Sequence, residues 1–275
     1  MNKIDSGLYI VSTPIGNLGD ITLRALEVLK KSDIILCEDT RRSFKLLNHF
    51  NIKKKLISYH KFNEKKELNG IIKYLNEGKI LSLISDAGTP LISDPGRLLV
   101  RTCLDRGINV IPVPGVSSIT TSISISGFKD QFLFFGFLPK KEKELEKILS
   151  SISKINFSQI FFIPALKVNF YLKYFKKHYQ GRHILIAREL TKLHESFYRA
   201  EIDNINMFKT PIKGELTVVI SEKETKDKIF NEVEITKKAK KLLKTKTLKD
   251  VVNLLFESEK MGKKKIYQIC LDLKK

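Results

Sequence analysis

The chain has 275 residues, enough for one or two domains that each bury a core. Its 50 lysines and arginines against 30 acidic residues give a net charge of +20, which favours a polyanionic partner. An AT-rich genome also enriches lysine, isoleucine and asparagine, so the charge alone does not identify that partner. No apolar run approaches the roughly 20 residues that span a bilayer, and the N-terminus lacks a secretory signal pattern. We therefore expect a cytoplasmic protein with no membrane contact.

Three cysteines, Cys37, Cys103 and Cys270, lie far apart in the sequence, and the five histidines are scattered. An odd number of widely spaced cysteines predicts reduced, buried thiols and no disulfide framework. No Cys/His cluster indicates a metal site.

The first third of the chain alternates short apolar runs with helical patterns. Strands are predicted at 8–11, 34–37, 55–58, 80–84 and 109–113. Asp20 is the predicted N-cap of one helix. A second helix is predicted over 64–76. Asp94 and Pro95 are the predicted N-cap and first residue of a third, which ends at Gly107. Continuous apolar strands between helices predict a mostly parallel sheet that helices cover on both faces.

A second domain is predicted after a helical stretch at 116–127 that crosses toward it. Its strands are predicted at 132–135, 159–163, 183–187 and 216–220, and its helices at 140–153 and 167–178.

The last 50 residues have a different composition. Residues 225–234 are charged and low in apolar content, which predicts a linker. Three short helices follow: one over 236–244, one with a capping box of Thr247 and Asp250, and one after a turn at Met261-Gly262. From residue 226 onward, 15 lysines and no arginine face 7 acidic residues, a surplus of 8 positive charges. We expect this basic helical segment to contact RNA; a solvated lysine surface is the alternative.

Three loops rich in Gly, Pro and small polar residues each follow a predicted strand: 12–20, 85–96 and 112–118. In an open parallel sheet, ligands bind beyond the carboxyl ends of the strands. The chain has no GxxxxGK[ST] phosphate loop, no GxGxxG after the first strand and no GxSxG elbow, which argues against kinases, NTPases, dinucleotide dehydrogenases and α/β-hydrolases.

These loops also carry a resemblance. The segments 13–18, 37–41, 85–90, 93–96, 136–139, 187–192 and 213–215 closely resemble, in the same order, the ribosomal RNA small subunit methyltransferase I family of the tetrapyrrole methylase superfamily. The resemblance implies two α/β domains (6–118 and 119–224) with S-adenosylmethionine (SAM) in the cleft between them, and a small helical appendix (232–275). It also implies 2′-O-methylation of a cytidine in 16S rRNA, and a homodimer.

Carried across motif by motif, the resemblance implies a set of residues that bind SAM. They are Pro14, Asp86, Ala87, Gly88, Leu91, Ile92, Ser117, Ser118, Ala187, Leu190, Glu215 and Leu216. One segment departs from the family. Where its members have Glu-Ser-x-His-Arg, this chain has Pro164-Ala165-Leu166-Lys167-Val168. Lys167 supplies a charge there, but it does not reproduce a bidentate arginine contact.

A ribose hydroxyl is a weak nucleophile, so transfer to it benefits from a general base. Glu38, Asp39, Asp94 and Glu189 are the candidates, with Asp39 ranked first and Asp94 ranked as structural because Pro95 follows it. Catalytic roles are thus expected for Asp39, Arg41 and Glu189, with Arg41 and Arg42 suited to holding phosphate. Two alternatives remain open at this point: a methyltransferase acting on a small molecule such as a tetrapyrrole, and a ribosome-binding protein without catalysis.

Overall fold

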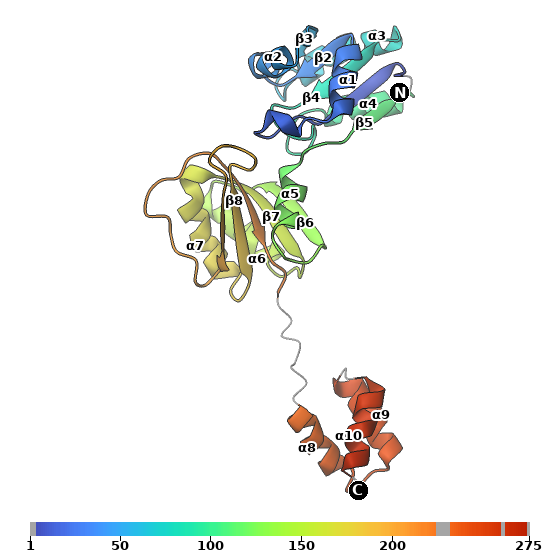
Figure 1. Cartoon of the computed structure of the whole chain (residues 1–275), viewed down its shortest axis with the longest axis vertical. Helices are drawn as coiled ribbons and strands as arrows, with labels where there is room; N and C mark the ends of the chain where they lie inside the picture. Colours follow the sequence, from blue (N-terminus) through green and yellow to red (C-terminus); the bar gives the residue numbers. More distant parts are fainter. Residues whose placement is uncertain (1–3, 224–231, 260–261, 274–275) are drawn as a thin grey trace. The chain divides into compact units, whose positions relative to one another are not determined.

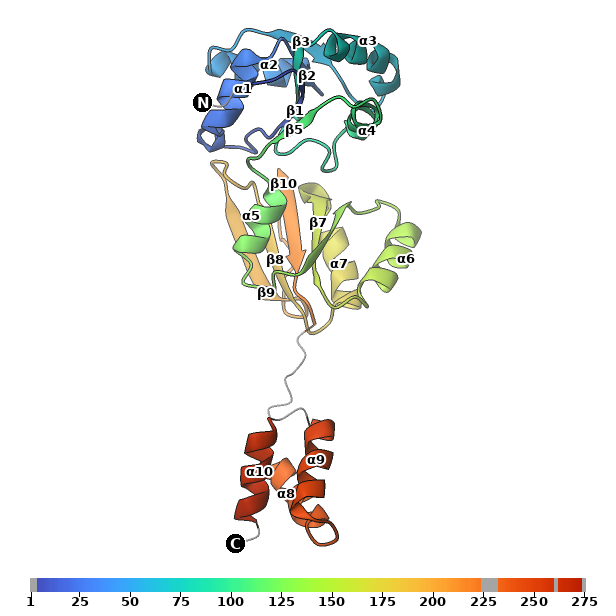
Figure 2. The ribbon, with the colours of Figure 1, turned by 90° about the vertical axis from the view of Figure 1, so that its right-hand side faces the viewer.

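A computed structural model of the chain describes residues 4–223, 232–259 and 262–273. The chain forms two compact units, Met1–Lys223 and Glu224–Lys275. The first unit contains two sheets, which Figures 1 and 2 show with their flanking helices.

The first sheet is parallel throughout, with the strand order β3-β2-β4-β1-β5. Its strands are β1 (Gly7–Val11), β2 (Ile34–Cys37), β3 (Lys55–Ser58), β4 (Ile80–Ile84) and β5 (Val110–Val113). Helices α1 (Leu23–Lys31) and α2 (Thr40–His49) contribute to the apolar cluster on one face, and α3 (Glu64–Asn76) and α4 (Arg97–Asp105) to that on the other. The predicted parallel sheet with helices on both faces is confirmed.

Two predicted helix starts are wrong. Helix α1 begins at Leu23, where Thr22 Oγ1 accepts a hydrogen bond from the Ala25 N–H. Asp20 lies before it, in the 3₁₀ turn Leu18–Asp20. Helix α4 begins at Arg97 with Gly96 as N-cap, so Asp94 does not cap it. Leu91 and Ser93 have positive φ angles of 69° and 68°, which keep the chain before Gly96 out of a helical conformation.

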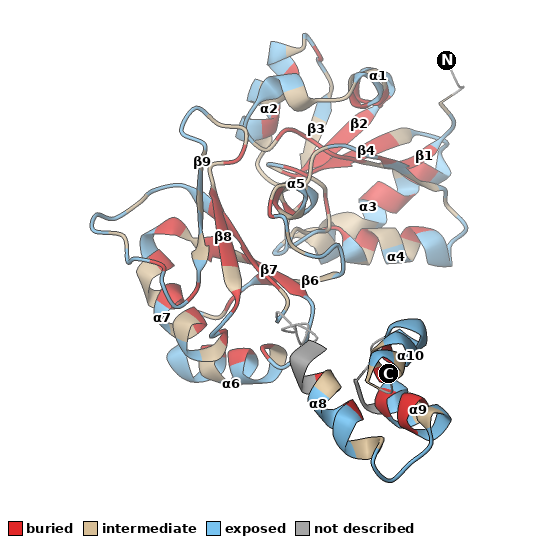
Figure 3. Cartoon of the chain, turned by 60° about the horizontal axis from the view of Figure 1, so that its bottom comes forward, coloured by how far each residue is buried: buried red, intermediate tan, exposed pale blue. Residues whose placement is uncertain are grey.

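The second sheet has the order β6-β7-β10-β8-β9, with only the β6–β7 pair parallel. Its strands are β6 (Phe132–Phe137), β7 (Ser158–Pro164), β8 (His183–Arg188), β9 (Ser196–Glu201) and β10 (Glu215–Ile220). Helices α6 (Glu142–Ile152) and α7 (Val168–His178) pack on one face, and α5 (Ser118–Ser124), which follows the first domain, packs on the other. Figure 3 shows the buried strands of both sheets.

The second unit consists of α8 (Glu232–Leu242), α9 (Leu248–Glu259) and α10 (Lys263–Asp272). Their inward faces form a separate apolar cluster that includes Ile235, Val251 and Ile266. The N-cap half of the predicted capping box is present, since the Asp250 N–H donates to Thr247 Oγ1. The Asp250 carboxylate accepts from the Thr247 hydroxyl at 2.6 Å. The predicted linker lies mostly outside the described residues, as does Met261 of the predicted turn.

Cys37, Cys103 and Cys270 are free and buried, as predicted. Within the described residues, no helix is both long and apolar enough to cross a membrane.

Candidate active site

The three Gly- and Pro-rich loops meet because their strands are neighbours. β4, β1 and β5 lie side by side and parallel, so the segments that follow them emerge at one edge of the sheet. Hydrogen bonds join these segments. Thr13 and Gly88 exchange two backbone hydrogen bonds of 2.9 and 3.0 Å, and Thr89 Oγ1 donates to the Val116 carbonyl. The loops therefore form one preorganised surface.

This surface forms one wall of a cavity of about 330 Å³. The opposite wall comes from one end of the second sheet: the last residues of β6, β7 and β8 and the first residues of β10. The register of the strands brings these residues to the same end of the sheet, because Glu215 pairs with Pro164 and Thr217 pairs with Ala187 across antiparallel strands. The cavity thus lies between the two α/β domains of the first unit.

Ten of the twelve expected cofactor residues line the cavity. They are Asp86, Ala87, Gly88, Ile92, Ser117, Ser118, Ala187, Leu190, Glu215 and Leu216. The other two do not belong to the lining. Pro14 is buried beside it, and Leu91 packs against the apolar cluster on the α3 and α4 face of the first sheet. Each lies next to a residue that does line the cavity, Ile15 and Ile92 respectively.

Several other lining residues had no predicted role. Those from the second domain are Ile119, Phe137, Phe162, Ile163, Pro164, Lys192 and Thr217; those from the first are Ile15, Thr89 and Ser93. Phe137 and Lys192 lie inside segments that carry the family resemblance, so the sequence could have indicated them as site residues. No sequence motif indicated Phe162 and Thr217, because only the pairing of the strands brings them to the cavity.

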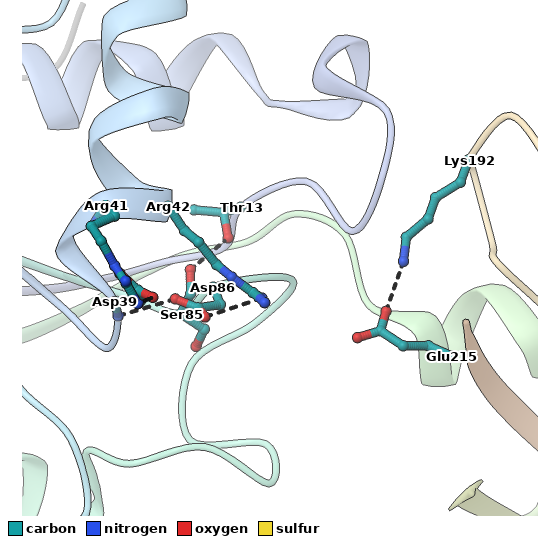
Figure 4. A network of polar contacts seen from close by, with 8 residues as sticks. All are labelled: Thr13, Asp39, Arg41, Arg42, Ser85, Asp86, Lys192 and Glu215. Carbon is teal, nitrogen blue, oxygen red and sulfur yellow. Dashed lines mark hydrogen bonds and ion pairs between the residues drawn. The ribbon is translucent and has the colours of Figure 1, made fainter. Parts of the chain in front are cut away.

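The side chain of the candidate base Asp39 is hydrogen-bonded to Arg41. Its side chain caps α2 by accepting from the Arg41 N–H and also accepts from Arg41 Nε and Nη2, at 2.8–3.1 Å (Figure 4). These hydrogen bonds lower the pKa of Asp39 to about 2. A carboxylate with so low a pKa is a weak base. Neither Asp39 nor Arg41 belongs to the cavity lining described above.

The side chain of Glu189, in the second domain, is likewise held by hydrogen bonds. Its Oε1 accepts hydrogen bonds from the Glu215 N–H at 2.9 Å and from Lys192 Nζ at 3.0 Å. Burial raises the pKa of Glu189, but these two hydrogen bonds and the positive charges of Lys192 and Arg188 outweigh it, so the net pKa is lowered. Lys192 also contacts Glu215 Oε2 at 2.9 Å, the pair drawn apart from the Asp86 group in Figure 4. Glu189 itself is not among the lining residues.

The remaining acidic groups gather at the carboxyl ends of β2 and β4. Asp86 accepts from the Asp39 N–H at 3.2 Å and pairs with Arg42 Nη1 at 3.3 Å. Burial raises the pKa of both Glu38 and Asp94, with a further upward contribution from the charge of Asp86. Arg42, Asp86 and Asp94 line the cavity, and Glu38 does not. No cluster of His, Cys, Asp and Glu within the described ranges is arranged to hold a metal ion.

The segment that departs from the family lies at the end of β7. Pro164 lines the cavity, and Ala165–Lys167 forms a 3₁₀ turn before α7. Leu166 is 72% exposed, and Lys167 Nζ lies 6.0 Å from the centre of the Phe170 ring. The segment therefore presents the apolar side chain of Leu166 and the positive charge of Lys167 to solvent.

The architecture and the sequence together define the class of protein. Residues 7–206 match the family described as Tetrapyrrole (Corrin/Porphyrin) Methylases. A solved structure, the uroporphyrin-III C-methyl transferase from Thermus thermophilus complexed with S-adenyl homocysteine, has the same fold with a TM-score of 0.54. It is 15% identical, over 78% of this chain and 97% of that one. This chain is thus a methyltransferase with the tetrapyrrole methylase fold.

Relatives of much higher sequence identity narrow this class to one family. The ribosomal RNA small subunit methyltransferase I of Mesomycoplasma conjunctivae is 46% identical over 85% of this chain and 98% of its own length. That of Buchnera aphidicola is 40% identical over 98% of this chain and 99% of its own, so the similarity includes the second unit. The chain belongs to the ribosomal RNA small subunit methyltransferase I family.

Proposed function

We propose that this enzyme transfers a methyl group from SAM to the ribose 2′-hydroxyl of a cytidine in 16S rRNA of the small ribosomal subunit. The observation that carries the proposal is the identity of 40–46% with relatives named as small subunit rRNA methyltransferases. The net charge of +20 fits a polyanionic substrate. That substrate places the enzyme in the cytoplasm, and we propose that it acts as a homodimer.

The chemistry of the cavity suits SAM. Its walls combine apolar side chains such as Ile15, Ile92 and Leu190 with the carboxylates of Asp86 and Glu215. Apolar walls with a few placed polar groups are typical of ligand sites of 300–1,000 Å³. Here the apolar walls fit the adenosine moiety, and the carboxylates fit the positive charges of the ammonium and sulfonium groups.

We assign SAM binding to the ten cavity-lining residues that the resemblance implies, and a supporting role beneath them to Pro14 and Leu91. When bound, SAM supplies an electrophilic methyl group on a sulfonium leaving group. The residues of the chain then have to hold the substrate oxygen in line and exclude water. Arg42, at the edge of the cavity beside Asp86, is placed to hold a phosphate of the substrate, with the exposed Arg41 next to it.

The proposal is tested by incubating the protein with 30S subunits from a strain that lacks the modification and with SAM labelled on its methyl group. Label on the ribose of one decoding-centre cytidine, mapped by nuclease digestion, is the expected result. 30S subunits that already carry the modification serve as the control and should accept no label. Absence of label on unmodified subunits, with SAM binding intact by calorimetry, would show that the substrate is a different molecule.

A further inference from the structure

Asp94 occupies an unusual place in the cavity wall. It lies between Ser93 and Pro95 in the segment that joins β4 to α4, and it lines the cavity. In this segment Leu91 and Ser93 both have positive φ angles, although neither is glycine. Such backbone conformations are strained for residues with a side chain, and they persist where the surroundings hold them, which is most often at functional sites.

Contacts from both domains hold this segment. Gly136 forms the bulge of β6 with a φ angle of 68°, and a Cβ at that position would lie 3.0 Å from Ser93 Oγ. On the other side, Gly96 lies close to β4, because a Cβ at that position would lie 2.7 Å from Leu83 Cδ2. The segment that carries Asp94 therefore lies between a strand of the first sheet and a strand of the second.

The other carboxylates of the site already have cationic partners. Asp86 pairs with Arg42, and Glu215 pairs with Lys192. Asp39 pairs with Arg41, and Glu189 pairs with Lys192. Within residues 4–223, Asp94 is the cavity-lining carboxylate for which no ion pair with Lys, Arg or His is formed.

We propose that Asp94 is the general base of the methyl transfer, an assignment that rests on the proposed function. As the substrate 2′-oxygen forms its bond to the methyl carbon, the carbon–sulfur bond breaks and its electron pair stays on sulfur. The O–H bond of the hydroxyl breaks in the same step, and its proton passes to a carboxylate oxygen of Asp94. The proton then leaves to solvent, which restores the carboxylate for the next turnover.

The charges around Asp94 agree with this role. Burial raises its pKa, the nearby Ser85 side chain lowers it, and the negative charge of Asp86 raises it again, with a net upward shift. Glu38 faces the same group of carboxylates, and Arg42 lies beside Asp86. A raised pKa makes Asp94 a stronger base than Asp39, whose pKa is about 2.

The test compares Asp94→Asn and Asp94→Glu with the wild type and with Asp105→Asn, an exposed carboxylate of α4. The readouts are the single-turnover rate on 30S subunits as a function of pH, SAM affinity by calorimetry, and melting temperature. We expect Asp94→Asn to lose about 10²–10⁴-fold in rate, with SAM affinity within threefold. The wild-type rate should fall as pH drops through the pKa of Asp94, and this limb should be missing in Asp94→Asn. Asp94→Glu should regain part of the rate, and Asp105→Asn should match the wild type.

Three outcomes would overturn the assignment. One is a rate for Asp94→Asn within threefold of the wild type. Another is a large loss of SAM affinity with the bound rate unchanged, which would make Asp94 a cofactor ligand. The third is a large loss in Asp39→Asn while Asp94→Asn stays active. The wild-type arm separates this test from that of the proposed function, because a wild type that binds SAM but labels no 30S ribose refutes the function itself.

Discussion

At the scale of single residues, Glu189 holds two loops of the second domain together. Its carboxylate joins the Glu215 N–H to the Lys192 ammonium, and Thr191 next to it accepts a hydrogen bond at 3.0 Å from the Asn17 N–H of the first domain. Both Glu189 and Thr191 have positive φ angles, of 51° and 65°. Because its carboxylate binds both of these groups, Glu189 is suited to positioning the part of the cavity wall that Leu190 and Glu215 form.

Replacing Glu189 by Gln should therefore change stability with a defined pH dependence. The pKa of Glu189 is lowered in the folded state, so its ionised form stabilises the fold above the unfolded value of about 4.3, and this stabilisation is lost as pH falls through the folded pKa. We expect Glu189→Gln to lower the free energy of unfolding by about 0.5–2 kcal/mol at pH 7. The difference from the wild type should shrink below pH 4.

Urea denaturation at several pH values measures this difference. Glu215→Gln is the matched control, because its side chain is 77% exposed and meets the same lysine. Exposed pairs contribute about 0–1 kcal/mol, so its effect should be smaller. A Glu189→Gln difference that grows toward acidic pH would contradict the argument.

Gly214 is required by the same arrangement. Its φ angle is 105°, and a Cβ at this position would lie 2.5 Å from Glu189 Cδ. Gly214→Ala should displace the Glu189 carboxylate and with it the first residue of β10, which lines the cavity. We expect SAM affinity to fall about tenfold, or roughly 1.4 kcal/mol, as measured by calorimetry. Gly78→Ala is a suitable control for the strain alone, since its φ angle is 78° but a Cβ there meets no atom within 4 Å; equal losses in both variants would remove the steric argument.

The sequence predicted most of the cavity wall because its residues lie in contiguous segments that each follow a strand. The prediction that Asp94 caps α4 is wrong for a physical reason. Asp before Pro is a strong local signal for a helix start, but Leu91 and Ser93 have positive φ angles and Ser93 lies close to Gly136 of β6. Gly136 is far from Ser93 in the sequence, so no local pattern contains this proximity.

At the scale of secondary structure elements, short apolar runs located nine of the ten strands within a residue or two. β9 was missed because its residues alternate between half-buried and exposed positions at the edge of the sheet, which leaves no apolar run. Helix α2 was not predicted, because Asp39, Arg41 and Arg42 were considered only as candidate catalytic and phosphate-binding residues. Asp39 is in fact its N-cap, and Ser43 and Leu47 form its buried stripe.

Arg182 joins the ends of several elements in the second domain. It is 1% exposed, and its guanidinium donates to the carbonyls of Ser153 after α6, Ile155 before β7 and Ser221 after β10. Arg182→Met would leave buried carbonyls without a donor. We expect it to lower the free energy of unfolding by about 2–4 kcal/mol.

Arg182→Lys should restore only part of this stability, because an ammonium lacks the planar fork that reaches several carbonyls at once. Arg101→Met, at a side chain that is 76% exposed, should cost less than about 0.5 kcal/mol. Urea midpoints of the three variants rank these effects, and equal losses for Arg182→Met and Arg101→Met would refute the role of the buried hydrogen bonds.

At the scale of the whole molecule, the second unit adds charge and a core of its own. Ile235, Ala239, Val251, Leu255 and Ile266 are buried among its three helices. Lys240, Lys241, Lys244 and Lys264 do not belong to this apolar cluster and are all exposed. We therefore expect that these four lysines can lose their charge without loss of the fold of this unit.

Changing Lys240, Lys241, Lys244 and Lys264 together to Gln tests whether this charge binds RNA. Each phosphate contact contributes about 0.7 to the slope of log affinity against log salt for single-stranded RNA, so the slope for 30S subunits should fall by up to about 3. The KM for 30S subunits should rise, while SAM affinity and kcat stay unchanged because the cavity belongs to the first unit. The four corresponding Lys→Arg changes keep the charge and should leave both KM and slope as in the wild type. If the Gln variant keeps the wild-type slope, the lysines form a solvated surface, and the contacts to RNA must come from the first unit, where Arg41 and Arg42 stand beside the cavity.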